Sequence, residues 1–407
     1  MIETELTDKL FVGGEWVGES SGGKTFDVLN PATGEAIAFL PDGGREEMRK
    51  SIDAASAAQE GWGRTTAQHR SGILRKAVAL MHERKEHLAR VMTLEQGKPL
   101  AESRGEIGYA ASFLEWFAEE GRRVYGQMIP AAFPEKRIMV LKRPVGVTAA
   151  ITPWNFPSAM ITRKLGPALA AGCTMVIKPS ELTPISALEI AKIFEEAGLP
   201  EGVLSVVCGM DPASITAAIM EDIRVRKLSF TGSTEVGKLL MRQAADTVKR
   251  LSLELGGHAP FVVFEDADID AAVEGAVASK MRNMGQTCVA ANRIYVQKGV
   301  ADEFARKLAA RLGEMKVGDG FEEGVEVGPL IEPKALEKVE RHVADAKEKG
   351  ATVLLGGARP NGSSGTNGGG TFYAPPILTD ADDSMLVANE ETLGPVAAIL
   401  RSRRRKR

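Results

Sequence analysis

The chain has 407 residues, 44% of them hydrophobic. A chain of this length is longer than a single hydrophobic core usually supports, so two or more packed domains are expected. Acidic and basic residues nearly balance, at a net charge of −3, which excludes a broad basic surface for nucleic acid. No apolar stretch is long enough to cross a membrane, and the acid-containing N-terminus resembles neither a secretory signal nor a transit peptide.

The N-terminal part of the chain predicts short strands followed by helices. LFVGGEWV indicates strands, and NPATGE indicates a turn. Apolar residues at three- and four-residue spacing then predict helices over 45–60, 67–92 and 101–121. From about residue 138 the pattern returns to strands.

A regular alternation of apolar strands and amphipathic helices follows. Such an alternation is typical of βαβ units, with a parallel sheet that is covered on both faces. It predicts an α/β fold with a doubly wound, Rossmann-like domain. The strands are GVTAAI, TMVIK, VLSVV, RKLSF and RLSLEL, and the helices between them are SAMITRKLGPALAAG, ISALEIAKIFEEAG, PASITAAIM and TEVGKLLMRQAAD.

A second alternation near Pro260 predicts a second α/β domain, which gives a division into residues 1–255 and 256–400. Its strands are FVVF, RIYVQ and TVLLGG, and its helices span 268–284, 300–314 and 333–350. The stretch NGSSGTNGGG at 361–370 predicts a surface loop, because it has no means of burying itself. Residues 401–407, RSRRRKR, form a basic tail that interrupts an expected strand.

Three cysteines are present, at Cys173, Cys208 and Cys288. This odd, sparse count argues against a disulfide framework and favours a reducing compartment, so we expect a cytoplasmic protein. Cys173 and Cys208 have apolar neighbours, as inert core cysteines do. Cys288, in NMGQTCVAANR, lies between a predicted helix and strand, where loops present reactive groups; an isolated cysteine is nevertheless more often structural.

Two polar residues stand out in the predicted Rossmann-like domain. Glu254, in LSLELGG, is expected to be buried in a strand, where desolvation would suit it to general-base work; a structural carboxylate bonded to the adjacent turn is an equal alternative. Asn155, in TPWNFP, follows the first strand of the parallel sheet and could donate to an oxyanion, or could only bond its own backbone in a rigid turn.

Two further segments have the pattern of a nucleotide site. FTGSTEVG predicts a strand, a turn and a helix N-terminus that could hold a pyrophosphate, although many βα turns look similar. In IKPSE, Lys178 ends a strand and Glu181 follows three residues later. The pair could share ribose hydroxyls at a sheet edge, or could be a surface ion pair.

Taken together, ITPWNFP, IKPSE, FTGSTEVG, LELGG and GQTCVAANR resemble the aldehyde dehydrogenase superfamily, and EETLGPV at 390–396 extends the resemblance over almost the whole chain. Within this superfamily, the residues of these motifs are most similar to those of succinate-semialdehyde dehydrogenases. The resemblance implies that Cys288 attacks the aldehyde carbon, that Asn155 and the Cys288 backbone N–H form the oxyanion hole, and that Glu254 activates water to hydrolyse a thioester.

The resemblance also implies NAD or NADP as cofactor and no metal. Glu181 indicates a preference for NAD, because a carboxylate accepts from a ribose 2′-hydroxyl and repels a 2′-phosphate. The residues that the resemblance assigns to the cofactor are Trp154, Lys178, Ser180, Glu181, Gly232, Ser233, Gly237 and Glu391.

Two arginines suggest the substrate class. Arg163 follows the Asn155 loop, and Arg282 lies six residues before Cys288. Two guanidinium groups could clamp a substrate carboxylate, which predicts succinate semialdehyde first and glutarate semialdehyde or another short semialdehyde second. Each could also be an ordinary ion-paired arginine.

The resemblance carries an expectation about assembly and about the C-terminus. It implies a homo-oligomer, with a strand-rich oligomerisation segment near 122–146. Relatives continue beyond the position of the basic tail, so a truncated or frameshifted C-terminus is expected. The alternative to an active dehydrogenase is an inactive remnant that only binds nucleotide.

Overall fold

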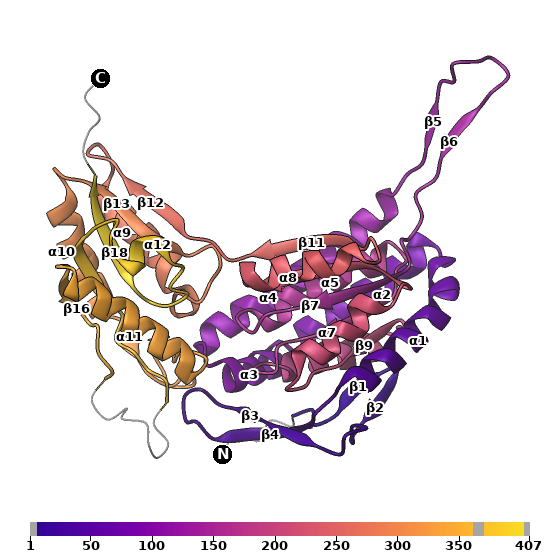
Figure 1. Ribbon diagram of the computed structural model, residues 1–407, viewed down its shortest axis with the longest axis horizontal. Coiled ribbons are helices and arrows are strands. Elements are labelled where there is room, and N and C mark those ends of the chain that lie inside the picture. The colour runs from indigo at the N-terminus through magenta and orange to yellow at the C-terminus, as the bar shows by residue number, and fades with distance from the viewer. Residues whose placement is uncertain (1–5, 361–369, 403–407) are drawn as a thin grey trace. The chain divides into compact units, whose positions relative to one another are not determined.

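A computed structural model describes residues 6–360 and 370–402, which form two compact units (Figure 1). Within these residues, the first unit comprises 6–28, 37–92 and 104–254, and the second comprises 29–36, 93–103 and the described residues from 255 onward. The division at residue 254 lies next to the predicted boundary, but two short N-terminal segments also belong to the second unit. Nothing in the strand and helix pattern indicated these two segments.

A seven-stranded sheet forms the centre of the first unit, and its four central strands β7 to β10 run parallel (Figure 1). Every residue of β7, β8 and β9 is buried, as predicted for strands that are covered on both faces. The order across the sheet is β11 (Arg250–Leu255), β10 (Val225–Gly232), β7 (Val147–Ile151), β8 (Met175–Lys178), β9 (Leu204–Val206), β1 (Leu10–Val12) and β2 (Glu15–Val17).

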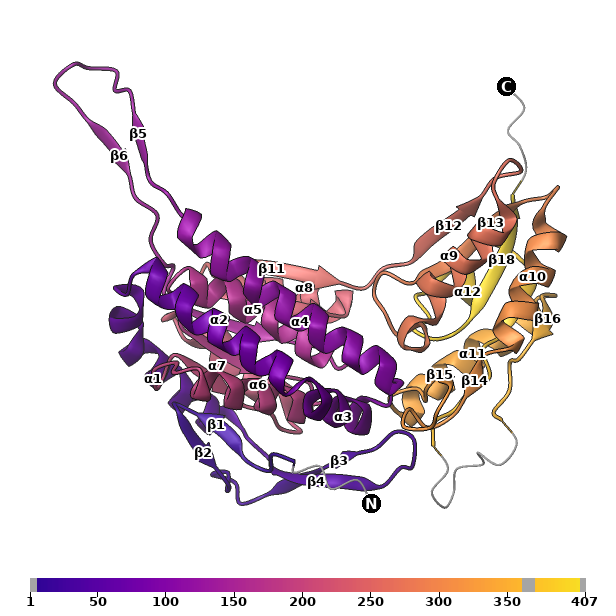
Figure 2. The same ribbon diagram turned by 180° about the vertical axis from the view of Figure 1, so that it is seen from behind.

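Helices cover both faces of this sheet, which confirms the predicted α/β fold. One face carries α1 (Arg45–Gly63), α7 (Pro212–Glu221) and α8 (Thr234–Ala245). The other face, toward the viewer in Figure 2, carries α2 (Ala67–Glu83), α4 (Leu100–Glu120), α5 (Pro157–Ala170) and α6 (Ile185–Glu196). The single helix predicted over 67–92 is wrong, because the chain leaves the helical conformation at Arg84 and α3 (Lys85–Gln96) begins after it.

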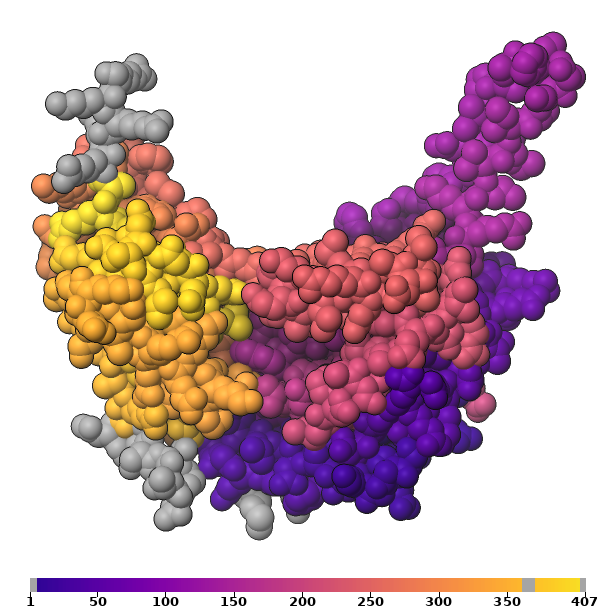
Figure 3. Space-filling view, viewed as in Figure 1, coloured from indigo at the N-terminus to yellow at the C-terminus, as the bar shows by residue number. Residues whose placement is uncertain are grey.

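A hairpin projects from the first unit between α4 and β7, after the short 3-10 helix η1 (Gly121–Arg123) (Figure 3). Its antiparallel strands are β5 (Gln127–Ile129) and β6 (Ile138–Val140), and all six residues are exposed. Five of them are large and apolar: Met128, Ile129, Ile138, Met139 and Val140. The segment predicted near 122–146 is therefore strand-rich and leaves apolar side chains without cover in the chain itself.

A five-stranded sheet forms the centre of the second unit, with the order β12 (Ala259–Val263), β13 (Ala291–Gln297), β18 (Ala397–Ser402), β17 (Ile377–Ala381) and β16 (Thr352–Leu355). Residues alternate between its two faces: Ile399 packs toward α9 (Ile269–Met281) and α10 (Ala301–Gly313), whereas Ala398 and Leu400 pack toward α11 (Pro333–Glu348) and α12 (Leu386–Asn389). The remaining elements are η2 (Arg282–Gly285), β14 (Lys316–Val317) and β15 (Val325–Val327).

The two N-terminal segments are tied to this second unit by backbone hydrogen bonds. Segment 29–36 forms the turn between β3 (Thr25–Leu29) and β4 (Ala36–Pro41), as NPATGE predicts, and Thr371 donates to the Pro31 carbonyl at 3.1 Å. In segment 93–103, the Leu100 N–H donates to the Gly320 carbonyl at 2.9 Å. The second unit is therefore built from three stretches of the chain.

The predicted loop and basic tail are described only in part. Residues 361–369 and 403–407 lie outside the described residues. Arg401 and Ser402 continue β18, and the Arg401 guanidinium pairs with Asp302 at 2.6 Å and Asp380 at 3.0 Å. Across the described ranges, no helix is long and apolar enough to span a membrane.

Candidate active site

The order of the parallel strands places a topological switch at β7. The chain runs from β7 outward through β8 and β9, and then returns to the other side of β7 to form β10. Ligands bind in such sheets at the carboxyl ends of the strands where the direction of winding reverses. The Asn155 loop follows β7 and the Gly232 turn follows β10, so two predicted segments lie on this crevice.

A buried carboxylate anchors the Asn155 loop where it enters α5. Glu106 of α4 accepts hydrogen bonds from the N–H groups of Ser158 at 3.0 Å and Ala159 at 3.2 Å. A carboxylate at a helix N-terminus satisfies free N–H groups and complements the helix dipole. Asn155, just before this turn, is buried. The sequence did not predict a role for Glu106, because a glutamate on an amphipathic helix cannot be distinguished from a solvent-exposed charge by its sequence pattern.

The IKPSE segment forms the predicted pair. The Lys178 ammonium group donates to the Glu181 carboxylate at 2.9 Å, with Lys178 buried and Glu181 about a third exposed. The pair follows the carboxyl end of β8, and the Ser180 hydroxyl accepts from the Leu182 N–H at 3.2 Å within the same turn. The next loop residue, Thr183, donates to the Trp154 carbonyl at 3.4 Å, which links this turn to the Asn155 loop.

FTGSTEVG folds as a strand, a turn and a helix N-terminus, as predicted. Ser233 is the N-cap of α8, and its hydroxyl accepts from the Val236 N–H at 3.3 Å, while the Gly237 N–H donates to the Ser233 carbonyl at 3.0 Å. A Cβ atom at Gly232 would lie 2.5 Å from the Phe230 ring, so the ring would have to shift to admit a side chain there. The turn thus keeps its backbone bare beside a helix N-terminus, which suits a pyrophosphate.

Glu254 differs from the prediction in one respect. It lies on β11 at the edge of the sheet and is exposed, so the expected burial is wrong. Its charge instead acts on Lys164 of α5, a buried residue whose ammonium group donates to the Ser229 hydroxyl at 3.0 Å. Burial lowers the pKa of Lys164 to about 8, and the negative charge of Glu254 opposes this shift. Lys164 was also missed in the sequence.

Arg163 is held by two aromatic residues of α4. Its guanidinium donates to the Tyr109 hydroxyl at 2.7 Å and lies 4.7 Å from the centroid of the Phe113 ring. Its Nε is buried and makes no hydrogen bond in the described part of the chain. No ion pair to Arg163 is formed among these residues, so the guanidinium keeps donors for an anion.

Cys288 lies on a sharply reversed turn of the second unit. After α9, Asn283, Met284 and Gly285 adopt positive φ angles of 51°, 58° and 70°. Such angles cost energy at non-glycine residues and persist only where surrounding contacts impose them. Here the Asn283 N–H donates to Glu102 at 2.8 Å, and Gln96 donates to the Asn283 side chain at 2.9 Å, both from segment 93–103.

The turn makes Cys288 the accessible thiol. Cys288 is half-exposed, whereas Cys173 and Cys208 are buried, as the sequence predicted. Burial raises the pKa of Cys173, which keeps that thiol protonated and inert.

The segment 390–392 is fixed beside the Cys288 turn. On one side, fully buried His342 of α11 lies 3.1 Å from the Thr392 hydroxyl and 3.4 Å from the Glu390 carboxylate. Burial lowers the pKa of His342 to about 4, so its ring is neutral near pH 7. On the other side, Glu391 lies against Gly256, where a Cβ atom would be 2.2 Å from a carboxylate oxygen; at Gly257 it would be 3.6 Å from the Cys288 carbonyl.

Arg282, the second predicted arginine, begins η2 and is exposed in the second unit, whereas Arg163 belongs to the first.

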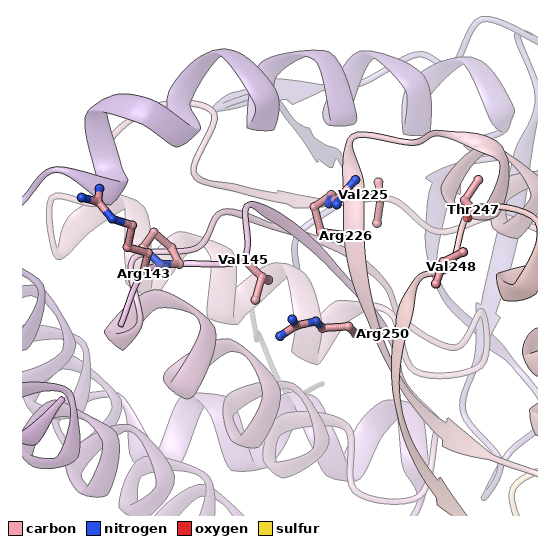
Figure 4. Close-up of a pocket in the computed structure, with 8 residues that line it drawn as sticks. Arg143, Val145, Val225, Arg226, Thr247, Val248 and Arg250 are labelled. Carbon is pink, nitrogen blue, oxygen red and sulfur yellow. The ribbon is translucent and has the colours of Figure 1, made fainter. Parts of the chain in front are cut away.

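A pocket of about 250 Å³ lies in the first unit, at the amino ends of β7, β10 and β11, and three of its lining residues are Arg143, Arg226 and Arg250 (Figure 4). None of the predicted site residues lines it. Among the described residues, no group of three histidine, cysteine or acidic side chains could hold a metal ion.

Known proteins resemble the chain over nearly its whole length. The model of the aldehyde dehydrogenase family matches residues 16–406. The glutarate-semialdehyde dehydrogenase of Pseudomonas aeruginosa is 56% identical over 391 residues, 96% of this chain and 79% of that protein. The succinate-semialdehyde dehydrogenase NADP(+) GabD of Escherichia coli is 55% identical over 390 residues, again 96% and 79%.

A solved structure also matches the chain over nearly its whole length. The crystal structure of succinate-semialdehyde dehydrogenase from Burkholderia pseudomallei matches with a TM-score of 0.95 and 54% identity, over 98% of this chain and 81% of that chain. Sequence, fold and structural likeness agree with the motifs described above. The chain therefore belongs to the aldehyde dehydrogenase family and is an oxidoreductase that acts on aldehydes.

Proposed function

We propose that the chain oxidises a short semialdehyde to the corresponding dicarboxylic acid, with succinate semialdehyde as first substrate and glutarate semialdehyde as second. The observation that carries the proposal is the reversed turn that makes Cys288 the accessible thiol of the three. Relatives named for succinate and glutarate semialdehyde, at 55% and 56% identity, support the substrate class.

The proposed reaction begins at the Cys288 sulfur. The thiolate attacks the aldehyde carbon, and the carbonyl oxygen becomes an oxyanion that accepts hydrogen bonds from the Asn155 side chain and the Cys288 N–H. NAD(P), when bound, supplies the hydride acceptor, which leaves a thioester on Cys288. Glu254 then takes a proton from water, whose oxygen attacks the thioester carbon and releases the acid and the thiolate.

The residues at the sheet edge fit a dinucleotide. The bare turn at Gly232, with Ser233 and Gly237 at the start of α8, would receive the pyrophosphate. The Lys178–Glu181 pair would bind the adenosine ribose, with Ser180 and Trp154 on the adjoining turns, and Glu391 would bind the nicotinamide-side ribose.

We expect NAD to be preferred over NADP, because the Glu181 carboxylate repels a 2′-phosphate. The kcat/KM for NAD should exceed that for NADP by about tenfold or more. The substitution Glu181→Gln should lower the ratio of these two kcat/KM values by a similar factor. Glu196→Gln, on α6 and paired with Arg84, is the matched control and should leave the ratio unchanged. A KM for NADP equal to or below that for NAD contradicts the preference.

Arg163 and Arg282 are proposed to bind the second carboxylate of the substrate. Arg163→Ala should raise KM for succinate semialdehyde by about tenfold or more, because a charge-assisted bidentate contact is lost, and should change KM for propanal little. Arg75→Ala, an exposed arginine of the same unit paired with Glu119, is the control. If Arg163→Ala raises KM equally for succinate semialdehyde and propanal, the proposal that Arg163 binds the second carboxylate of the substrate is wrong.

One assay tests the function directly. The purified chain, with NAD and succinate semialdehyde, should produce NADH, measured by its absorbance. If the chain binds NAD but forms no NADH with a panel of short aldehydes, it is the inactive nucleotide-binding remnant instead. We further propose a homo-oligomer, supported by the exposed apolar hairpin of β5 and β6, and a cytoplasmic location, supported by three free cysteines.

A further inference from the structure

The pocket of about 250 Å³ in the first unit lies at the edge of the sheet opposite the predicted cofactor residues. It is found at the amino ends of β7, β10 and β11, whereas the Asn155 loop and the Gly232 turn follow the carboxyl ends of β7 and β10. Eight described residues line it, and none of them is acidic; three are arginines, Arg143, Arg226 and Arg250. The pocket is therefore a hollow with three positive charges.

The chain does not neutralise these charges with carboxylates. In the part of the chain that the structure describes, Arg143 and Arg250 form no ion pair or side-chain hydrogen bond. Arg226 has a long hydrogen bond of 3.5 Å to a backbone carbonyl. Asp222, four residues before Arg226, is paired with Arg224 at 2.6 Å. The guanidinium groups at the pocket thus keep most of their donors for an anion.

A buried lysine adds positive charge beside the pocket. Lys249 directly precedes Arg250 and donates to the carbonyls of Asp222 at 2.5 Å and Val225 at 2.9 Å. Burial lowers the pKa of Lys249, the charge of Asp222 opposes this shift, and the positive charge of Arg226 adds to it. The same positive potential that disfavours the charge of Lys249 favours an anion in the pocket.

Two backbone conformations shape the pocket. Gly146 has a φ of 115°, and a Cβ atom there would lie only 3.2 Å from Cγ of Arg226, so the missing side chain makes room for this arginine. Val248 adopts a φ of 50° and is 86% exposed, although this region is strained for a β-branched residue. Arg250 extends toward Val145 (Figure 4). Specific local conformations, and not only long side chains on an open surface, therefore form the pocket.

We propose that this pocket is a second ligand site, which binds phosphate, free or as the terminal group of a small ester. Guanidinium groups match phosphate oxygens in bidentate pairs. The volume of about 250 Å³ lies below the range of about 300–1,000 Å³ that drug-sized ligands occupy, so it suits a phosphate or a short ester and not a dinucleotide. The site goes beyond the proposed oxidation, because none of the residues assigned to cofactor or substrate lines it.

Calorimetric titration with inorganic phosphate tests the site. The unmodified chain should bind phosphate saturably with a Kd on the order of 1 mM, and Arg250→Gln should raise this Kd by about tenfold, because a charge-assisted contact is lost. Arg242→Gln, an exposed arginine in the last turn of α8 that does not line the pocket, is the matched control and should leave the Kd unchanged.

Two further titrations separate this site from the other places where an anion could bind. The Kd for phosphate should be the same with and without NAD, and the same in Arg163→Ala, because neither the cofactor residues nor the substrate arginine belongs to the pocket. Phosphate should also raise the unfolding temperature of the unmodified chain more than that of Arg250→Gln, since a ligand of the folded state stabilises it.

Glycerol 3-phosphate distinguishes the two sources of the phosphate group. An affinity at least about threefold higher than that of inorganic phosphate identifies an ester as the ligand, because valine side chains at the pocket contact its carbon atoms, and equal affinity identifies free phosphate. The site is overturned if phosphate does not bind saturably, if Arg250→Gln binds it as the unmodified chain does, or if NAD or Arg163→Ala abolishes its binding.

Discussion

Replacing Cys288 with Ala should reduce kcat/KM for succinate semialdehyde by at least about 10⁴-fold, because the covalent pathway loses its nucleophile. Binding of NAD should be unchanged, since the proposed cofactor residues are intact. The measurement is the initial rate of NADH formation, with NAD affinity measured on the same preparation.

Thiol alkylation provides a matched control for this prediction. Cys288 is half-exposed while Cys173 and Cys208 are buried, so iodoacetamide should modify a single thiol of the native chain and all three after denaturation. NAD-dependent activity should fall in proportion to that first modification. Full activity in a chain alkylated at Cys288, or in Cys288→Ala, contradicts the assignment of the nucleophile.

Replacing Glu254 with Gln should slow turnover by about 10²- to 10⁴-fold, because water loses its general base and the thioester accumulates. The first turnover, which needs only thiolate attack and hydride transfer, should remain fast. Rapid-mixing experiments should therefore show a burst of NADH of about one equivalent per site, followed by a slow steady rate.

The burst separates the proposed role from a structural one. Glu265→Gln, an exposed carboxylate on the loop after β12, should behave as the unmodified chain does. If Glu254→Gln slows the burst and the steady rate equally, Glu254 acts before the thioester forms and not in its hydrolysis. The exposure of Glu254 at the edge strand β11 agrees with a residue that must reach water.

Much of the fold followed from periodicity, because buried parallel strands and amphipathic helices have distinct patterns. GVTAAI, TMVIK and the helices around them were predicted nearly to their ends. Periodicity could not predict the break at Arg84, because both helices continue the same apolar spacing. It also placed RLSLEL in the interior, although β11 is an edge strand, because a strand's position in a sheet depends on partners that are distant in sequence.

The residues of the candidate site also fall into two groups: those that local sequence patterns identify, and those that only the folded structure identifies. Cys288, Asn155 and the Lys178–Glu181 pair stand in motifs whose order along the chain is specific. Lys164 and Glu106 stand on helices, where a charged residue predicts a solvated face, and only tertiary packing shows that both are buried. Their positions depend on distant partners, Ser229 and Ser158 respectively, so no local pattern could identify them.

The three-part construction of the second unit constrains the order in which the chain can fold during synthesis. Segments 29–36 and 93–103 leave the ribosome well before β12, β13 and β18 exist. The first unit can complete its sheet while these segments still lack the partners that they contact in the native state, such as Gly320 and Thr371. The residues of the Cys288 turn are synthesised after the whole of the first unit and must return to Gln96 and Glu102, so the reactive thiol takes its position only after the cofactor domain has been made.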